Sequence, residues 1–165
     1  MRPEEHRLDC TIRAPQPADF EKIAELTGQL GYPCTPQEVE KRLAGMQDKE
    51  KYAVYVAALA NGEIAGWIGM HLFCCVELDI VVEINGLVVD KNVRSRGIGK
   101  RLLSAAERWA LSRGYDAITV RSNVRRHDAH RFYEKNGYGW TKTQKSFRKV
   151  LMAGDTHVSR GPGLD

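Results

Sequence analysis

The chain is 165 residues long, with 42% hydrophobic residues, 28% charged residues and a formal net charge of +4. This length suits one domain with a buried core, and the composition is typical of a soluble globular protein and excludes a disordered one. No uncharged run is long enough to span a membrane, and the charged N-terminus lacks the apolar core of a signal peptide. We therefore expect a cytoplasmic protein with no membrane partner.

Cysteine spacing and charge distribution narrow the class further. The cysteines and histidines show neither zinc-ligand spacing nor a disulfide framework, so we expect reduced thiols and no metal. Positive charge gathers in residues 91–101 and 121–131, without a basic helix interleaved with aromatic residues. This distribution favours a small ligand that carries phosphate and argues against a nucleic-acid partner.

The first half of the chain is predicted to contain four strands and two helices. Thr35-Pro36 is a typical helix start, Asn61-Gly62 a typical hairpin turn, and residues 80–89 are rich in β-branched side chains. The predicted elements are a strand over 11–13, helices over 17–30 and 36–46, and strands over 52–56, 63–73 and 77–90.

The second half is predicted to continue with alternating helices and strands. Helical spacing of apolar residues runs up to Arg113, and glycine follows the predicted helix ends. The predicted elements are a long helix that follows the loop at 94–100 and ends at Arg113, a strand over 116–122, a helix over 128–136 and a closing strand within 138–151. The order is β-α-α-β-β-β-α-β-α-β, an α/β fold of one domain, followed by a disordered tail over 152–165.

The most informative segment is the loop at 94–100, Arg-Ser-Arg-Gly-Ile-Gly-Lys, between a predicted strand and a predicted helix. Backbone N–H groups at a helix start lack intrahelical partners, and two glycines let an anion approach them closely. The loop has no Gly-Lys-Ser/Thr ending and no Gly-x-Gly-x-x-Gly pattern, which excludes the P-loop and the dinucleotide fingerprint. It predicts a binding site for a pyrophosphate.

Two signatures resemble those of the GNAT family of N-acetyltransferases. The loop matches the family's Gln/Arg-x-x-Gly-x-Gly/Ala pattern, and residues 129–138 match its Ala-x-x-Phe-Tyr-Glu-x-x-Gly-Phe/Tyr pattern. The predicted element order also matches the family over residues 8–151. The resemblance implies a GNAT fold over 1–151, with a mixed central β-sheet flanked by helices.

The resemblance implies acetyl-CoA as the acetyl donor. Its pyrophosphate would be bound by Arg94, Ser95, Arg96, Gly97, Ile98, Gly99 and Lys100, and its pantetheine arm would pair with the backbone of Leu87, Val88 and Val89. Gly86 within the strand predicts a bulge or a close backbone approach. In the family, a bulge here directs an N–H group at the thioester oxygen. The family's cofactor-binding asparagine is replaced by Arg126. Asn123 could instead reach the pantetheine, with Arg125 or Arg126 at a phosphate, so whether Asn123 or Arg126 contacts the cofactor is left open.

The resemblance also implies the catalytic residues. Tyr133 would act as the general acid that protonates the departing thiolate, since a phenol with a pKa near 10 is protonated at neutral pH. Glu83 is the candidate general base, either in direct contact with the amine or through water. Glu77, Asp79 and His71 are its competitors.

These features predict an N-acetyltransferase that attacks acetyl-CoA directly in a ternary complex. The acceptor is a primary amine of a small molecule or a peptide, and a homodimer is expected by analogy with the family. The alternative is a non-catalytic domain that senses acyl-CoA.

Overall fold

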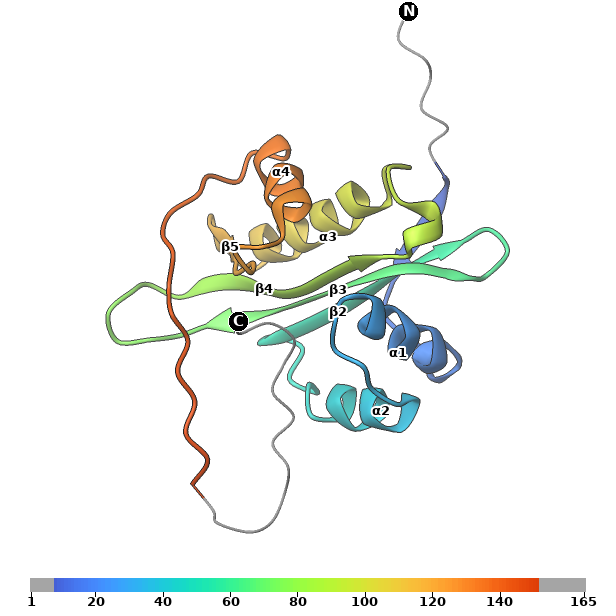
Figure 1. Ribbon diagram of the computed structural model, residues 1–165, viewed down its shortest axis with the longest axis horizontal. Coiled ribbons are helices and arrows are strands. Elements are labelled where there is room, and N and C mark those ends of the chain that lie inside the picture. The colour runs from blue at the N-terminus through green and yellow to red at the C-terminus, as the bar shows by residue number, and fades with distance from the viewer. Residues whose placement is uncertain (1–7, 152–165) are drawn as a thin grey trace, which may run out of the picture. The chain divides into compact units, whose positions relative to one another are not determined.

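A computed structural model describes residues 8–151 of the chain (Figure 1). The chain divides into two compact units, one ending at Arg121 and the other starting at Ser122. The predicted disordered tail over 152–165 lies outside the described residues.

The first unit is built on a five-stranded sheet in the order β1-β2-β3-β4-β5. Neighbouring strands from β1 to β4 are antiparallel, and β5 is parallel to β4, so the sheet is mixed as predicted. The strands are β1 (Cys10–Arg13), β2 (Tyr52–Leu59), β3 (Ile64–Phe73), β4 (Val81–Val89) and β5 (Ile118–Val120). Strand β4 starts later than predicted because Val76, Leu78 and Ile80 lie in an exposed connection instead of in the ladder.

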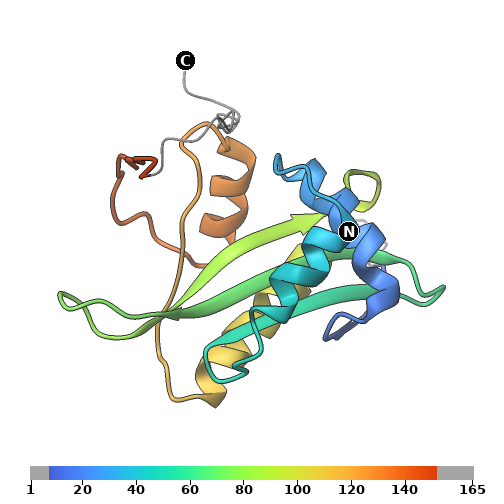
Figure 2. The same ribbon diagram turned by 90° about the horizontal axis from the view of Figure 1, so that it is seen from below.

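Helices cover both faces of this sheet (Figures 1 and 2). Helices α1 (Phe20–Gln29) and α2 (Pro36–Ala44) lie on one face, and α3 (Ile98–Ser112) lies on the other. A 3₁₀ turn, η1 (Pro17–Asp19), precedes α1. Thr35 caps α2 as predicted, because its hydroxyl accepts from the Glu38 N–H and the Glu38 carboxylate accepts from the Thr35 N–H. No helix within residues 8–151 is long and apolar enough to cross a bilayer.

A β-bulge interrupts β4 at Asn85. Gly86 pairs with Gly69 of β3 and Ile84 pairs with the next residue, Met70, so Asn85 has no partner in the register. A Cβ atom on Gly86 would lie 2.6 Å from Cη2 of Trp67, which leaves room only for glycine. The close approach predicted from Gly86 is therefore present, and an indole ring causes it.

Strand β5 accompanies only the first part of β4. Its ladder with β4 runs from Val82 to Ile84 and stops at the bulge. Strand β4 continues to Val89 and remains paired with β3 on its other side. The second half of β4 therefore has one edge that β5 does not cover.

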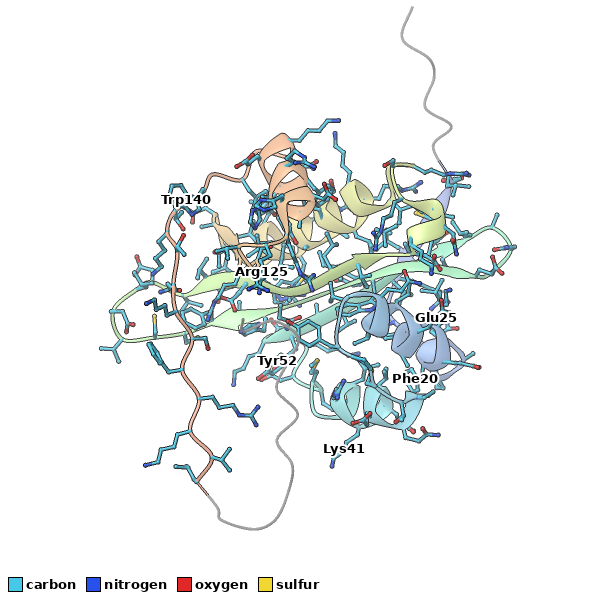
Figure 3. The ribbon with its side chains drawn as sticks, in the orientation of Figure 1. Phe20, Glu25, Lys41, Tyr52, Arg125 and Trp140 are labelled. Atoms are coloured by element: carbon cyan, nitrogen blue, oxygen red, sulfur yellow. The ribbon has the colours of Figure 1, made fainter. Side chains whose placement is uncertain are left out.

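The second unit contains α4 (His127–Lys135), close to the predicted 128–136. The closing strand predicted within 138–151 is wrong, because no residue of this segment forms a strand. In an extended chain, Trp140 and Phe147 would point to opposite faces, so the segment has no single apolar face to bury. Both side chains are exposed, Trp140 at 80% and Phe147 at 89% (Trp140 is labelled in Figure 3).

We predict that Gly86→Ala lowers the free energy of unfolding by about 1–3 kcal/mol, because the added methyl group collides with Trp67. Gly28→Ala is the matched control. Gly28 lies within α1 with open space around it, so alanine there is expected to stabilise the helix by about 0.5–1 kcal/mol. Urea unfolding of both variants measures the difference. Equal stabilities would contradict the close packing of Trp67 on Gly86.

Candidate active site

The glycine loop adopts a backbone suited to anion binding. After β4, a short 3₁₀ helix, η2 (Lys91–Val93), leads into the turn at Arg94. Ser95 has a φ of 62° and Gly97 a φ of 82°, both in the left-handed region, and Gly97 is the N-cap of α3. Successive backbone N–H groups in such turns form a concave nest for an anion. The first turn of α3 carries no acidic residue.

Side chains of the loop divide between solvent and core. Arg94, Ser95, Arg96 and Lys100 are exposed, whereas Ile98 is 1% exposed and anchors the helix start against the sheet. The Arg94 Nε donates to the Val89 carbonyl at 3.1 Å, which fixes the start of the turn. The exposed cations and the free helix start can together bind a phosphate group.

The start of this loop is tied to α1. The Lys22 ammonium lies 2.7 Å from Oδ2 of Asp90, the residue between β4 and η2. The Asp90 carboxylate also accepts from the Asn92 N–H, and the Lys91 N–H donates to the Gln29 side chain, both at 3.0 Å. Burial acts to raise the pKa of Asp90, but these hydrogen bonds and the Lys22 charge outweigh it and hold the pKa below its usual range.

The uncovered edge of β4 presents backbone groups at alternate residues. The Asp90 N–H donates to Ala65 of β3 at 2.8 Å, so the peptide groups of Val88 also face β3. Those of Leu87 and Val89 then face away from β3, toward the edge that β5 leaves open. The side chain of Val88 packs in the core beneath α1. An amide-bearing chain can pair with such an edge as an added strand does.

Glu83 is a buried carboxylate on one face of the sheet. It is 8% exposed and lies on β4, two residues before the bulge. Its Oε2 accepts from Nε of Arg121 at 2.8 Å and lies 2.7 Å from Nη2. The guanidinium lies over the Phe73 ring, 5.0 Å from its centroid, and the Arg121 side chain remains 61% exposed. A carboxylate inside an apolar strand is thus matched by a cation from the end of β5.

A row of polar and aromatic side chains surrounds Glu83. Tyr52, His71, Glu83 and Thr119 are paired in register across β2, β3, β4 and β5, so they share one face. Tyr52 and His71 are stacked with centroids 6.3 Å apart, and the Asn85 amide is 3.4 Å from Nδ1 of His71 (Tyr52 is labelled in Figure 3). The other competitors for the base, Glu77 and Asp79, are exposed in the connection before β4.

Tyr133 belongs to the second unit, on α4. Its ring contacts those of Phe132 and Tyr138, with centroids 5.3 Å and 5.6 Å away. Burial raises the pKa of Tyr133 to about 12, against a smaller opposing effect of the Arg126 charge. The phenol is therefore protonated over the whole physiological range and can donate a proton.

Asn123 and Arg126 lie in one turn ahead of α4. The Arg126 N–H donates to the Asn123 carbonyl at 3.0 Å, and Oδ1 of Asn123 accepts from the Arg125 N–H at 2.9 Å. Arg126 is the N-cap residue of α4, and its side chain provides no cap. The choice between these two residues as a cofactor contact stays a prediction.

The first unit contains three of the predicted features in succession along β4 and the loop that follows it: Glu83, the edge of β4 and the glycine loop. Sequence reasoning missed two of their partners, Arg121 and Lys22. The only sequence feature that could have indicated Arg121 as a partner of Glu83 is its place as a cation near the end of a predicted strand. No sequence feature indicated Lys22 as a partner of Asp90, since its spacing in α1 is that of an ordinary surface lysine.

The arrangement fits acetyl-CoA by its chemistry. A cation-rich loop with left-handed turns suits the phosphates, and the open edge beside it suits the amides of the pantetheine arm. Among residues 8–151, no three histidine, cysteine or acidic side chains cluster as metal ligands would. The four cysteines are all free thiols.

Comparison with known proteins identifies the family. Residues 20–138 match the sequence profile of the acetyltransferase (GNAT) family, a single match that runs through both units. The chain therefore belongs to this family and is an acetyl-CoA-dependent N-acetyltransferase by class.

Two curated relatives act on different amines. An aminoalkylphosphonate N-acetyltransferase of Salmonella typhimurium is 40% identical over 85 residues, which is 51% of this chain and 55% of that protein. The match thus spans about half the length of that relative. An aminoglycoside N(6')-acetyltransferase type 1 of Stenotrophomonas maltophilia is 29% identical over 146 residues, covering 86% of this chain and 94% of that protein.

Solved structures share the fold. Glucosamine-6-phosphate N-acetyltransferase from Arabidopsis thaliana aligns with a TM-score of 0.73 at 22% identity, over 85% of this chain and 98% of that one. AAC(6')-Iy in complex with the bisubstrate analogue CoA-S-monomethyl-acetylneamine aligns with a TM-score of 0.74 at 20% identity, over 86% and 99%. At these identities the likeness concerns the fold, which is that predicted from the sequence.

Proposed function

We propose that this chain transfers the acetyl group of acetyl-CoA to the primary amine of a small molecule, with Glu83 as general base and Tyr133 as general acid. The observation that carries the proposal is the position of one uncovered edge of β4 between an anion-binding loop and a buried carboxylate. When bound, acetyl-CoA supplies an acyl group activated as a thioester. Everything else in the reaction falls to side chains and peptide groups of the protein.

Donor binding is assigned to the loop and the edge. The nest at 94–100 would hold the pyrophosphate, and the peptide groups of Leu87 and the N–H of Val89 would pair with the arm. The peptide groups of Val88, predicted to take part, face β3 instead, and the Val89 carbonyl already accepts from Arg94. The bulge at Asn85 reorients the peptide groups next to Gly86 at the point where the covered and uncovered parts of β4 meet. An N–H fixed at this point can stabilise negative charge that develops on the acyl oxygen.

Proton removal from the acceptor is assigned to Glu83. An amine must lose its proton before it attacks, and Glu83 is the buried carboxylate on the row that crosses the sheet. Both Arg121 bonds go to Oε2, which leaves Oε1 to accept from the amine or from a water between them. The carboxylate is thus oriented before the acceptor arrives.

The first test is mass-spectrometric detection of acetylated products from acetyl-CoA and a pool of primary amines, with wild type and Tyr133→Phe. We predict that Tyr133→Phe lowers the turnover number about 10²-fold and leaves acetyl-CoA binding unchanged, because only proton donation to the thiolate is lost. With a Tyr133 pKa of about 12, wild-type turnover should not decline through loss of the acid below about pH 11.

Tyr138→Phe is the control for this test, since it removes a hydroxyl from the neighbouring ring on the same unit. Equal losses in both variants would show a packing effect and contradict the acid role. Tight acetyl-CoA binding by the wild type, with no product from any amine, would favour the alternative of an acyl-CoA sensor.

We predict that Glu83→Gln lowers kcat/KM about 10²-fold at neutral pH, with a smaller loss at a pH above the pKa of the acceptor amine. The loss shrinks because an amine that is already neutral needs no base. Glu77→Gln, which changes an exposed carboxylate before β4, should leave the pH profile unchanged. A loss for Glu83→Gln that is constant with pH would contradict the base role.

The acceptor proposed for this site is a small amine that also bears an anionic group. Arg121 presents an exposed guanidinium beside the proposed base, and such a planar fork binds phosphonate or carboxylate oxygens in pairs. The curated relative that acts on aminoalkylphosphonates is consistent with this choice. A polycationic aminoglycoside would instead be repelled by the positive charge of Arg121.

We predict that 1-aminoethylphosphonate is acetylated with a kcat/KM at least about tenfold above that of ethylamine, which lacks only the phosphonate. Arg121→Met should remove this preference, mainly through KM for the phosphonate. Arg108→Met, at an exposed arginine of α3, should keep it. Equal use of both amines by the wild type, or faster turnover of aminoglycosides, would contradict an anionic acceptor.

A further inference from the structure

A buried negative charge lies at the entrance of the loop that the proposed function assigns to pyrophosphate. Asp90 is 6% exposed and stands between the last residue of β4 and η2. The Arg94 side chain folds back to the carbonyl of Val89, next to it in the chain. A carboxylate in this place would repel the phosphates of an incoming ligand if nothing compensated it.

Lys22 of α1 compensates this charge. Its ammonium is 2.7 Å from Asp90 and 2.9 Å from the exposed Glu25 on the same helix. The Lys22 side chain is 31% exposed and the Asp90 side chain 9%, so the pair is largely shielded from solvent on the Asp90 side. In such surroundings a charge acts over a longer distance than it does in water.

We propose that Lys22 is a positioning residue for donor binding, which acts through Asp90 by cancelling its charge so that the glycine loop accepts a pyrophosphate. The inference rests on the proposed function of the loop and adds a residue 72 positions before Arg94 to it. Lys22 touches neither the acyl group nor the acceptor amine in this scheme. Its effect is confined to the affinity for the phosphate-bearing part of the donor.

The alternative is an ordinary ion pair that only holds α1 on the sheet. The two roles differ in what happens when both charges are removed. If the pair serves as a strap, Lys22→Met and Lys22→Met with Asp90→Asn lose the same link. If the pair serves charge balance, the double variant regains what the single variant lost, because no unpaired carboxylate remains.

The test is calorimetric titration of the full chain with CoA. We expect Lys22→Met to raise the dissociation constant about tenfold, Lys22→Arg to leave it within about twofold, and the double variant to return to within about twofold of wild type. Lys51→Met, at a lysine paired with Asp48 on the surface, is the control and should have no effect. Thermal unfolding identifies any variant that fails to fold.

A second ligand distinguishes charge compensation from a purely structural ion pair by an independent measurement. Pantetheine, the arm without phosphates, should bind wild type and Lys22→Met equally in titrations followed by protein NMR. Reduced CoA affinity in both the single and the double variant would overturn the inference, as would unchanged affinity in Lys22→Met. If Lys22→Met does not fold, Lys22→Arg and the double variant decide by the same criterion. A wild type that does not bind CoA would overturn the proposed function itself.

Discussion

The extra residue in β4 is the constraint on which the site depends. Because strand side chains alternate with a period of two, one inserted residue changes which side chains share a face on either side of it. Before the bulge, Val82 and Ile84 pair with β5 and are buried. After it, β4 follows β3 alone. A covered and an uncovered edge thus meet within one strand. Glycine is required at position 86, because the Trp67 ring occupies the space that a side chain there would need.

Local chemistry made much of this arrangement predictable. The glycine within a β-branched run indicated the bulge, and the strand, glycine loop and helix in succession indicated the anion site. Partners of buried groups were not predictable, because they depend on tertiary register. Arg121 reaches Glu83 only because β5 is parallel to β4 with Thr119 opposite Glu83. No spacing in the sequence states that register.

The closing strand is an element that was predicted from the sequence and is absent from the structure of residues 138–151. Residues 138–151 contain β-type side chains, but these do not alternate consistently with the polar ones. Lys142, Lys145 and Lys149 interrupt any face that Trp140 or Phe147 could share with a neighbour. Propensity without periodicity is weak evidence for a strand, because a strand is stabilised by burial of one face. The strand predicted over 116–122 is also longer than β5, which spans Ile118–Val120.

Two buried carboxylates, Glu83 in β4 and Asp90 just after it, have different proposed roles. Each is paired with a cation from a distant element. Asp90 follows the last residue of β4, where the proposed ligand brings phosphates, and Lys22 cancels its charge from α1. Glu83 lies near the other end of the strand, where the proposed reaction needs a base, and Arg121 orients it. Because each of these two carboxylates has a cation beside it, neither is an uncompensated buried charge. In the proposed reaction, the negative charge of the donor and that of the acceptor would be bound near separate ends of β4, with the reacting groups between them.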